Sequence, residues 1–310
     1  MTLRVTIRAA RSRVLALGLA GLVLLSTALT CSARADDGAG EPLFRLRDSR
    51  IVESSSLVVS TTEPGLAYTA NDGPTPRVYA IDTRTGRTLG TTDIAGVVAS
   101  DIEAMAPGPG GALYVGDIGD NDAARSDIRV FRIAEPQRGR TATRAVTYRL
   151  RYPDGAHDAE ALLVAPSGRL IVVSKELLGG TVYAAPHRLV PGSVNDLRPL
   201  AAAPSLVTDG AVLAGGRLAV LRTYAAATAY RLPGWQRVLS WPLPSQRQGE
   251  SLAAGPEATT LLVGSEGSAS PVFTAAVPAS AVLAAVVPRR LSTALRAVVA
   301  AVLGVLLTRD

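Results

Sequence analysis

Residues 101–131 of the chain read DIEAMAPGPGGALYVGDIGDNDAARSDIRVF. Short runs of apolar residues are separated here by glycine, proline, asparagine and aspartate, which is the pattern of short strands joined by tight turns. The stretch therefore predicts three strands. The first begins with Asp101 and Glu103, the second ends in Asp117, and the third ends in Phe131.

Similar three-strand units recur along the chain. Each third strand ends in valine or alanine followed by an aromatic residue, and the spacings of 52, 52, 47 and 43 residues separate Tyr79, Phe131, Tyr183, Tyr230 and Phe273. The chain has only three phenylalanines and eight tyrosines, so five of eleven at this one position argues against chance. A period of 40 to 55 residues with three or four short strands is typical of β-propeller blades.

The five aromatic positions favour an all-β fold, a β-propeller of five blades. Little chain remains after Phe273 for a final outer strand, so we expect residues 44–52 to pair with the last blade and to join the two ends of the ring. A blade cannot bury both of its faces alone, and the ring must therefore close. Six blades remain the alternative, because the connections at 134–150 and 184–207 are long enough to contain further strands.

The first 35 residues have the pattern of a secretory signal peptide. A basic start precedes an apolar run from Val14 to Leu29, and Ala33-Arg34-Ala35 forms a small-x-small cleavage site. An uncleaved membrane anchor is the alternative, as is lipid attachment at Cys31, the only cysteine. We expect an exported protein, extracellular or held on the outer face of the cytoplasmic membrane, with a propeller over residues 36–280.

Residues 281–310 form a different kind of segment, an apolar helix. Residues 291–307 would be its membrane-contacting part, although they are short for a span and include Arg296. A membrane anchor and a helix packed on a surface both remain open.

The formal net charge of +6 gives a misleading picture of the folded part. The first 35 residues contain five arginines and no acid, so the rest of the chain carries about +1. This charge gives no support for nucleic-acid binding. The chain has two histidines and no histidine or cysteine cluster, which excludes a metal site built on several of them.

The first strand of each propeller blade lines the central channel, and several of these strands carry acids. We expect the channel acids to be Asp101, Glu103, Asp158, Glu160, Asp209 and Glu250. Converging carboxylates repel one another unless a cation neutralises them, and their oxygens suit Ca²⁺ or Mg²⁺. In the structural interpretation, each acid instead accepts backbone N–H groups of the next blade and locks the ring.

Two further groups of residues are candidates for chemistry. In the loop after the second strand, Asp117, Asp120 and Asn121 are candidate metal ligands together with Glu160, unless the loop is simply shaped by an Asx turn. The candidate catalytic residues are His157, Asp158, Glu160 and Lys175. Lys175 is the only lysine of the chain, and an ion pair with Glu160 or Glu176 is its structural alternative.

Several units resemble a known group of proteins. EAMAPGPGGALYVGDIGDN, RVFRIAEP, RYPDGAHDAEALLVAPSGRLIVVSKE and GESLAAG are similar to secreted bacterial β-propeller proteins that are distantly similar to the esterase-like phytase propellers. The resemblance covers roughly residues 49–278. It implies the fold and membership of that group, and it implies no catalytic set.

Three functions follow as hypotheses. The preferred one is a monomeric exported propeller that binds a small ligand or a protein partner at an acidic channel mouth, with Ca²⁺ or Mg²⁺ as the cofactor. The second is a metal-assisted hydrolase of phosphoesters or lactones, in which Asp117, His157, Asp158 and Glu160 hold the metal or activate water. The third is a purely structural scaffold.

Overall fold

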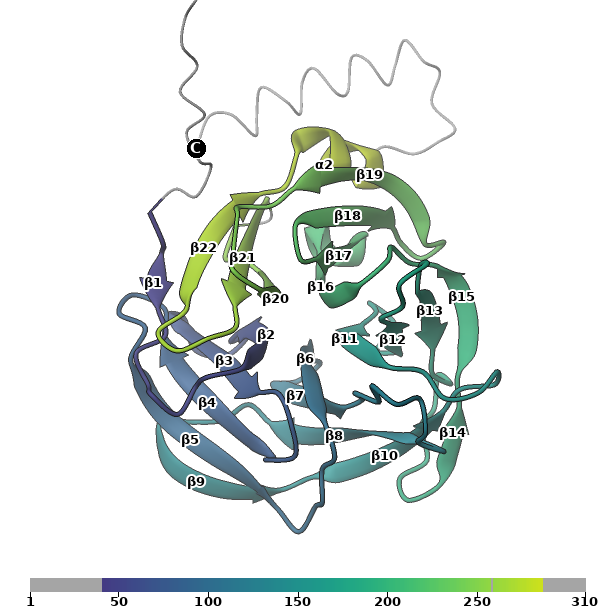
Figure 1. Ribbon diagram of the computed structural model, residues 1–310, viewed down its shortest axis with the longest axis horizontal. Helices are drawn as coiled ribbons and strands as arrows, with labels where there is room; N and C mark the ends of the chain where they lie inside the picture. Colours follow the sequence, from purple (N-terminus) through teal and green to yellow (C-terminus); the bar gives the residue numbers. More distant parts are fainter. Residues whose placement is uncertain (1–40, 258, 287–310) are drawn as a thin grey trace, which may run out of the picture. The chain divides into compact units, whose positions relative to one another are not determined.

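The computed structural model describes residues 41–257 and 259–286, in which five β-sheets surround a central channel (Figure 1). The predicted five-bladed propeller is confirmed. The predictions for residues 1–35 and 287–310 lie outside the described residues. At the C-terminal side the structure describes one helical segment, α2 (Ala279–Val286). No helix of the described residues is long and apolar enough to cross a membrane.

Each blade begins with a strand at the channel and continues outward. Blade 1 contains β2 (Ser54–Val59), β3 (Leu66–Asn71), β4 (Arg77–Asp82) and β5 (Thr88–Ala95). Blade 2 contains β6 (Ile102–Gly108), β7 (Ala112–Asp117), β8 (Ile128–Ala134) and β10 (Val146–Arg151). Blade 3 contains β11 (Ala159–Val164), β12 (Leu170–Ser174), β13 (Thr181–Ala184) and β15 (Arg198–Ala202).

Blade 4 contains β16 (Val207–Leu213), β17 (Leu218–Thr223), β18 (Ala226–Arg231) and β19 (Gln236–Pro242), and a short 3-10 turn, η1 (Ala214–Gly216), joins its first two strands. Blade 5 contains β20 (Gly249–Ala254), β21 (Thr260–Ser265) and β22 (Pro271–Ala276). Its fourth strand is β1 (Phe44–Arg45), which pairs with β22 as Phe44 opposite Val272. The start of the propeller thus closes the last blade, as the sequence predicts.

The two long connections contain strands, but these strands form no sixth blade. In the first connection, β9 (Gly139–Arg144) runs parallel to β5 and becomes the fifth strand of blade 1 before the chain returns to blade 2 as β10. In the second, β14 (Val194–Asp196) adds a parallel strand to β10 before the chain returns to blade 3. Both connections therefore link neighbouring blades at the rim.

The hydrophobic core consists of five clusters, one between each pair of neighbouring blades. Each cluster contains one aromatic residue of the sequence repeat, and the five are Tyr79, Phe131, Tyr183, Tyr230 and Phe273. All five are buried. The repeat is explained by this position, because a large ring fills the widening gap between two blades and gives each interface much of its buried area.

Candidate functional site

Every channel strand carries a β-bulge at the same place. The register shifts fall between residues 54 and 56, 102 and 104, 159 and 161, 207 and 209, and 249 and 251. A bulge sets two residues opposite one and re-aims a side chain. The residues at this position are Ser55, Glu103, Glu160, Thr208 and Glu250. Three of the five blades therefore present a glutamate at one level of the channel.

We call this end of the channel the acidic mouth, formed by Glu103, Glu160, Glu250 and the acids that flank them. The three glutamates are 4%, 6% and 4% exposed, so they are largely removed from bulk water. The residues directly after the second strands of four blades lie at the same end, and they are Asp72, Lys175, Tyr224 and Glu266. Lys175 is the only lysine among these groups, so carboxylates dominate the mouth.

Three carboxylates come together between blades 1 and 2. One oxygen each of Asp72, Asp101 and Glu103 can lie within 4.8 Å of the others. Among the described residues, the Glu103 carboxyl group has no hydrogen-bond donor, and no arginine or lysine forms an ion pair with any of the three. We call them the carboxylate trio. Burial and the charges of Glu160 and Asp72 raise the pKa of Glu103 to about 11. Burial and the adjacent Asp101 raise the pKa of Asp72 to about 7.

Gly119 provides the space for this arrangement. A Cβ atom at residue 119 would lie 2.4 Å from Asp101 Oδ2 and 2.9 Å from Glu103 Cγ. The Gly119 amide also donates a hydrogen bond of 3.2 Å to the Asp101 carbonyl oxygen. The loop after β7 thus packs its backbone directly against two members of the trio, which only glycine permits without a shift.

The second cluster of the mouth joins blade 3 to blades 4 and 5. The Lys175 ammonium group contacts Glu160 in an ion pair and lies 5.4 Å from the centre of the Tyr224 ring. Burial and the neighbouring Glu250 raise the pKa of Glu160 to about 8, against the opposing effect of Lys175. Burial lowers the pKa of Lys175, but Glu160 outweighs it, so this pKa lies above its ordinary value.

Asp209 lies one residue beyond the bulge position, and its carboxylate is 3.5 Å from the Ser56 hydroxyl of blade 1, across the channel. It is fully buried, and its carboxylate accepts hydrogen bonds from Leu252 N at 2.7 Å and Gly210 N at 2.7 Å. This geometry matches the structural interpretation, in which an acid binds the backbone of the next blade. The equivalent side chain in blade 1 is Ser56, which accepts a hydrogen bond from Met105 N at 2.9 Å.

Arg222, opposite Asp209 in the sheet, is also fully buried. Its Nη1 donates to the carbonyl oxygens of Ser251 at 2.8 Å and Gly264 at 3.2 Å. Burial lowers the pKa of Arg222 to about 10. A Cβ atom at Gly249 would lie 1.8 Å from Arg222 Nη2, so glycine is needed beside this guanidinium. Asp209 and Arg222 together hold blade 4 against blade 5.

Two of the three loop candidates, Asp117 and Asp120, are engaged in interactions within blade 2. Asp117 is fully buried, accepts hydrogen bonds from the amides of Ser100 and Asp101, and pairs with Arg125 at 3.0 Å. Asp120 accepts the amides of Ala124 and Arg125, which is the predicted Asx-type turn. Asn121 is exposed. Neither aspartate belongs to the group of carboxylates that come within ligand distance of one another in the described residues.

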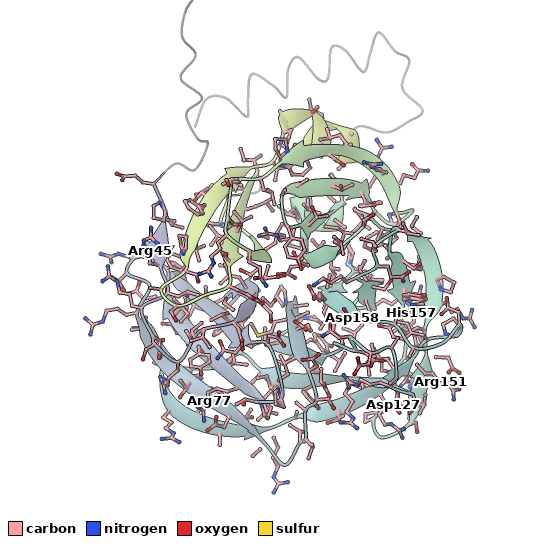
Figure 2. The ribbon with its side chains drawn as sticks, viewed as in Figure 1. Arg45, Arg77, Asp127, Arg151, His157 and Asp158 are labelled. Carbon is pink, nitrogen blue, oxygen red and sulfur yellow. The ribbon has the colours of Figure 1, made fainter. Side chains whose placement is uncertain are left out.

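His157 and Asp158 lie on different sides of the same loop. Figure 2 shows Asp158 near the central opening and His157 farther out. His157 Nε2 lies 3.1 Å from an oxygen of Asp154 and 3.1 Å from the Tyr183 hydroxyl, and its Nδ1 lies 3.2 Å from Glu176. Asp158 accepts a hydrogen bond of 2.8 Å from Asp120 N and thereby fixes the loop of blade 2.

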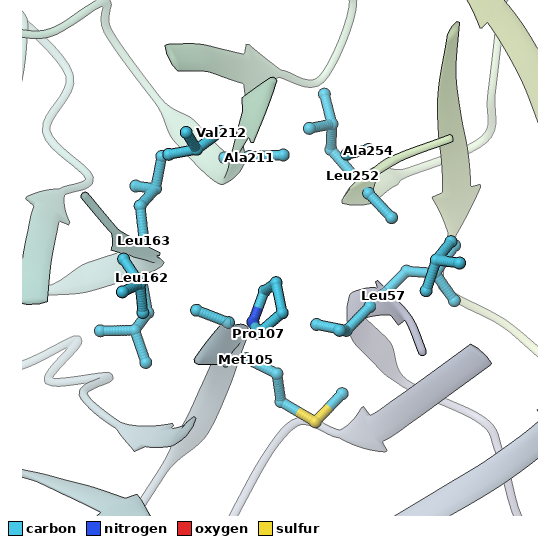
Figure 3. A pocket seen from close by; sticks show the side chains of 15 residues that line it. Leu57, Met105, Pro107, Leu162, Leu163, Ala211, Val212, Leu252 and Ala254 are labelled. Carbon is cyan, nitrogen blue, oxygen red and sulfur yellow. The ribbon is translucent and has the colours of Figure 1, made fainter. Parts of the chain in front are cut away.

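Beyond the bulges the channel changes character. Three consecutive residues of each inner strand line a small cavity of about 70 Å³, and they are residues 57–59, 105–107, 162–164, 210–212 and 252–254. Figure 3 shows the side chains of Leu57, Pro107 and Leu252 around this space. Every lining side chain is apolar, apart from Gly210, which has none. Within the channel, the acidic groups therefore lie on the mouth side of this apolar cavity.

Asp72 directly follows β3, at the place where Lys175 follows β12 and Glu266 follows β21, so the repeat predicts its position at the mouth. The sequence did not distinguish it as a metal ligand, because only the packing of blade 1 on blade 2 brings it to Asp101 and Glu103. The bulge leaves no such signal. Glu103, Glu160 and Glu250 stand at the bulge position, whereas blade 4 has Thr208 there and Asp209 one residue later.

Comparison with known proteins gives a limited result. No protein-family model matches the chain, and no curated protein matches it. Among solved structures, the chain is similar to XC5397 of Xanthomonas campestris, which is described as a gluconolactonase important in glucose secondary metabolic pathways. The two chains share 14% sequence identity over 71% of this chain and 70% of that chain, with a TM-score of 0.44. A likeness at this level says nothing of activity.

Proposed function

We propose that this protein is a ligand-binding propeller whose acidic mouth holds a divalent cation, with Ca²⁺ favoured, at Asp72, Asp101 and Glu103. The observation that carries the proposal is the unpaired Glu103. Glu103 is 4% exposed, its carboxyl group lies in a cluster with two further acids, and no donor or cation lies beside that group in the described residues. A buried acid in such surroundings is costly unless a cation completes it.

The donor set fits a hard cation that prefers oxygen. Three carboxylates supply three of the six to eight oxygens that Ca²⁺ takes, which leaves positions for water and for a ligand. An oxygen-rich ligand would enter at the mouth and complete the coordination, because the opposite half of the channel is apolar. If the chain is exported, as its first 35 residues predict, it meets Ca²⁺ at concentrations where sites with a Kd of about 10⁻⁴–10⁻³ M are useful.

Calorimetric titration of the full chain with CaCl₂ at pH 7.5 tests the proposal. We expect one Ca²⁺ per chain, and at least tenfold weaker binding in Glu103→Gln and Asp101→Asn. Glu53→Gln is the matched control, because Glu53 is an exposed acid beside the same mouth and lies outside the trio. The proposal fails if neither Ca²⁺ nor Mg²⁺ gives heat or a melting shift, or if Glu103→Gln binds as the wild type does.

A second candidate, a metal-assisted hydrolase of lactones or phosphoesters, rests on Glu160. This carboxyl group has a pKa of about 8 and influences the pKa of Glu103 through its charge. A bound cation would polarise the carbonyl or phosphoryl oxygen of the substrate. Deprotonated Glu160 would accept a proton from the attacking water and return it to the leaving alkoxide oxygen as the bond to that oxygen breaks, and a base with a pKa near the working pH is suited to this role. Lys175 would hold the Glu160 carboxylate in place through their ion pair.

Hydrolysis of a panel of lactones and phosphoesters with added Ca²⁺ or Mg²⁺ tests the second candidate. We expect Glu160→Gln to lower kcat by about 10²-fold or more while Ca²⁺ binding persists. Glu266→Gln, at the same mouth, is the control. Turnover that is absent from the whole panel, or that survives in Glu160→Gln, would leave the protein a binding module.

A further inference from the structure

The face of the ring opposite the acidic mouth contains a second cleft, between blades 3 and 4. β11 and β16 both begin at the mouth, so the turn after β11 and η1 after β16 lie at the other end of the channel. The cleft between them has a volume of about 540 Å³, which is within the usual range for small-molecule sites. It shares no lining residue with the mouth or with the apolar cavity of the channel.

The lining of this cleft combines apolar walls with unpaired basic groups. Leu200, Leu232, Pro233 and Trp235 contribute apolar surface, and Leu200 is 43% exposed although it is a large hydrophobic residue. Arg169, His187 and Arg217 also line the cleft, and none of its lining residues is acidic. Within residues 41–257 and 259–286, no carboxylate forms an ion pair with Arg169 or Arg217.

The fold holds the Arg169 side chain at the wall of the cleft. Its Nε donates a hydrogen bond to the carbonyl oxygen of Ala185, which holds the side chain against the end of blade 3 and leaves the terminal nitrogens for another partner. Arg217 approaches from blade 4, after η1. Guanidinium groups pair with carboxylates through two parallel hydrogen bonds, so two arginines at an apolar cleft suit an organic carboxylate with an apolar body.

We propose that this cleft, defined by Arg169, Leu200, Arg217 and Trp235, binds a small amphipathic carboxylate. The carboxylate group pairs with the arginines, and the hydrocarbon part covers Leu200 and the Trp235 wall. Charge complementarity selects this occupant, because a neutral or cationic molecule of the same shape leaves both guanidinium groups unpaired. The site is independent of the cation site at the mouth.

Tryptophan fluorescence tests the proposal with octanoate as the probe. The chain has two tryptophans, and Trp241 Nε1 has no hydrogen-bond partner in the described structure, so Trp241→Phe is a mild change that leaves Trp235 as the only reporter. We expect octanoate to change the Trp235 emission with a saturable, one-site curve. Octanol and octylamine should bind at least tenfold more weakly. If the three compounds titrate alike, or octanoate gives no saturable change, the proposal is wrong.

Two sets of variants in the Trp241→Phe background locate the site. Arg169→Gln with Arg217→Gln should weaken octanoate binding at least tenfold, whereas Arg84→Gln with Arg87→Gln, which removes two exposed arginines of blade 1, should not. Leu200→Asp should also weaken octanoate binding at least tenfold. Leu200→Asn, which has the same size without the charge, should weaken octanoate binding far less. Wild-type octanoate affinity in a folded Arg169/Arg217 double variant or in Leu200→Asp overturns the proposal.

Discussion

Glu103→Gln offers the sharpest test of the carboxylate trio, because it can be read as a pH dependence of stability without any ligand. In the unfolded chain the Glu103 carboxyl group titrates near its ordinary value of 4.5, whereas burial and neighbouring acids raise its pKa in the folded protein to about 11. The folded state therefore keeps a proton that the unfolded state loses. Stability is unaffected below pH 4.5 and falls as the pH rises from there towards 11.

The size of this loss of stability follows from the one proton that the folded state retains. Each pH unit between the two pKa values costs about 1.4 kcal/mol, so the wild type should lose up to about 4 kcal/mol relative to Glu103→Gln between pH 5 and pH 8. Glutamine has nearly the same shape and carries no charge. The variant should therefore be the more stable protein at pH 8 in the absence of divalent cations, although it loses the proposed cation site.

Urea unfolding at pH 5, 6, 7 and 8 in EDTA, followed by circular dichroism, measures this difference. Glu53→Gln, which alters an exposed acid beside the mouth, should give the same pH dependence as the wild type. Saturating CaCl₂ should then raise the stability of the wild type by about 2.7 kcal/mol at a hundred times its Kd, and that of Glu103→Gln by at most about 1.4 kcal/mol at the same concentration, because its binding is at least tenfold weaker. If the wild type and Glu103→Gln show parallel stability curves in EDTA, Glu103 does not retain its proton and the reasoning about the trio is refuted.

Three further changes test how the ring is held together and how the trio is kept open. Gly119→Ala places a Cβ atom 2.4 Å from an oxygen of Asp101, so calorimetry should show at least tenfold weaker Ca²⁺ binding, and unchanged affinity would contradict the close packing. Gly249→Ala collides with Arg222 and should cost about 1–3 kcal/mol in urea unfolding; a neutral effect would show that the guanidinium moves aside cheaply. Leu46→Ala opens a cavity at the closing blade and should cost about 2–5 kcal/mol, and a loss under 1 kcal/mol would mean that the closing segment is dispensable.

The blade count could be read from the sequence because it depends on a repeated local requirement. Each interface between two blades needs a large buried side chain, so an aromatic residue recurs near positions 79, 131, 183, 230 and 273, and the closing role of Phe44 follows from the missing outer strand of blade 5. β9 and β14 each add a parallel strand to the edge of a neighbouring blade, and no recurring residue in the sequence marks these two strands. β9 is mostly exposed, β14 has only three residues, and the partners of both strands are far away in the sequence.

Residues 101–131 by themselves determine a three-strand unit with acids at its start, and the repeat determines a ring whose channel is acidic at one end. The tertiary structure decides which acids face that channel. A strand alternates its side chains only while its register is unbroken, and Glu103, Glu160 and Glu250 stand at the bulge of their strands and lie in the mouth. Asp209 stands one residue beyond the bulge, where its carboxylate accepts the Leu252 amide of the next blade and lies 3.5 Å from the Ser56 hydroxyl of blade 1. The meeting of Asp72 with Asp101 and Glu103 is likewise a contact between two blades, which only the packing of blade 1 on blade 2 creates.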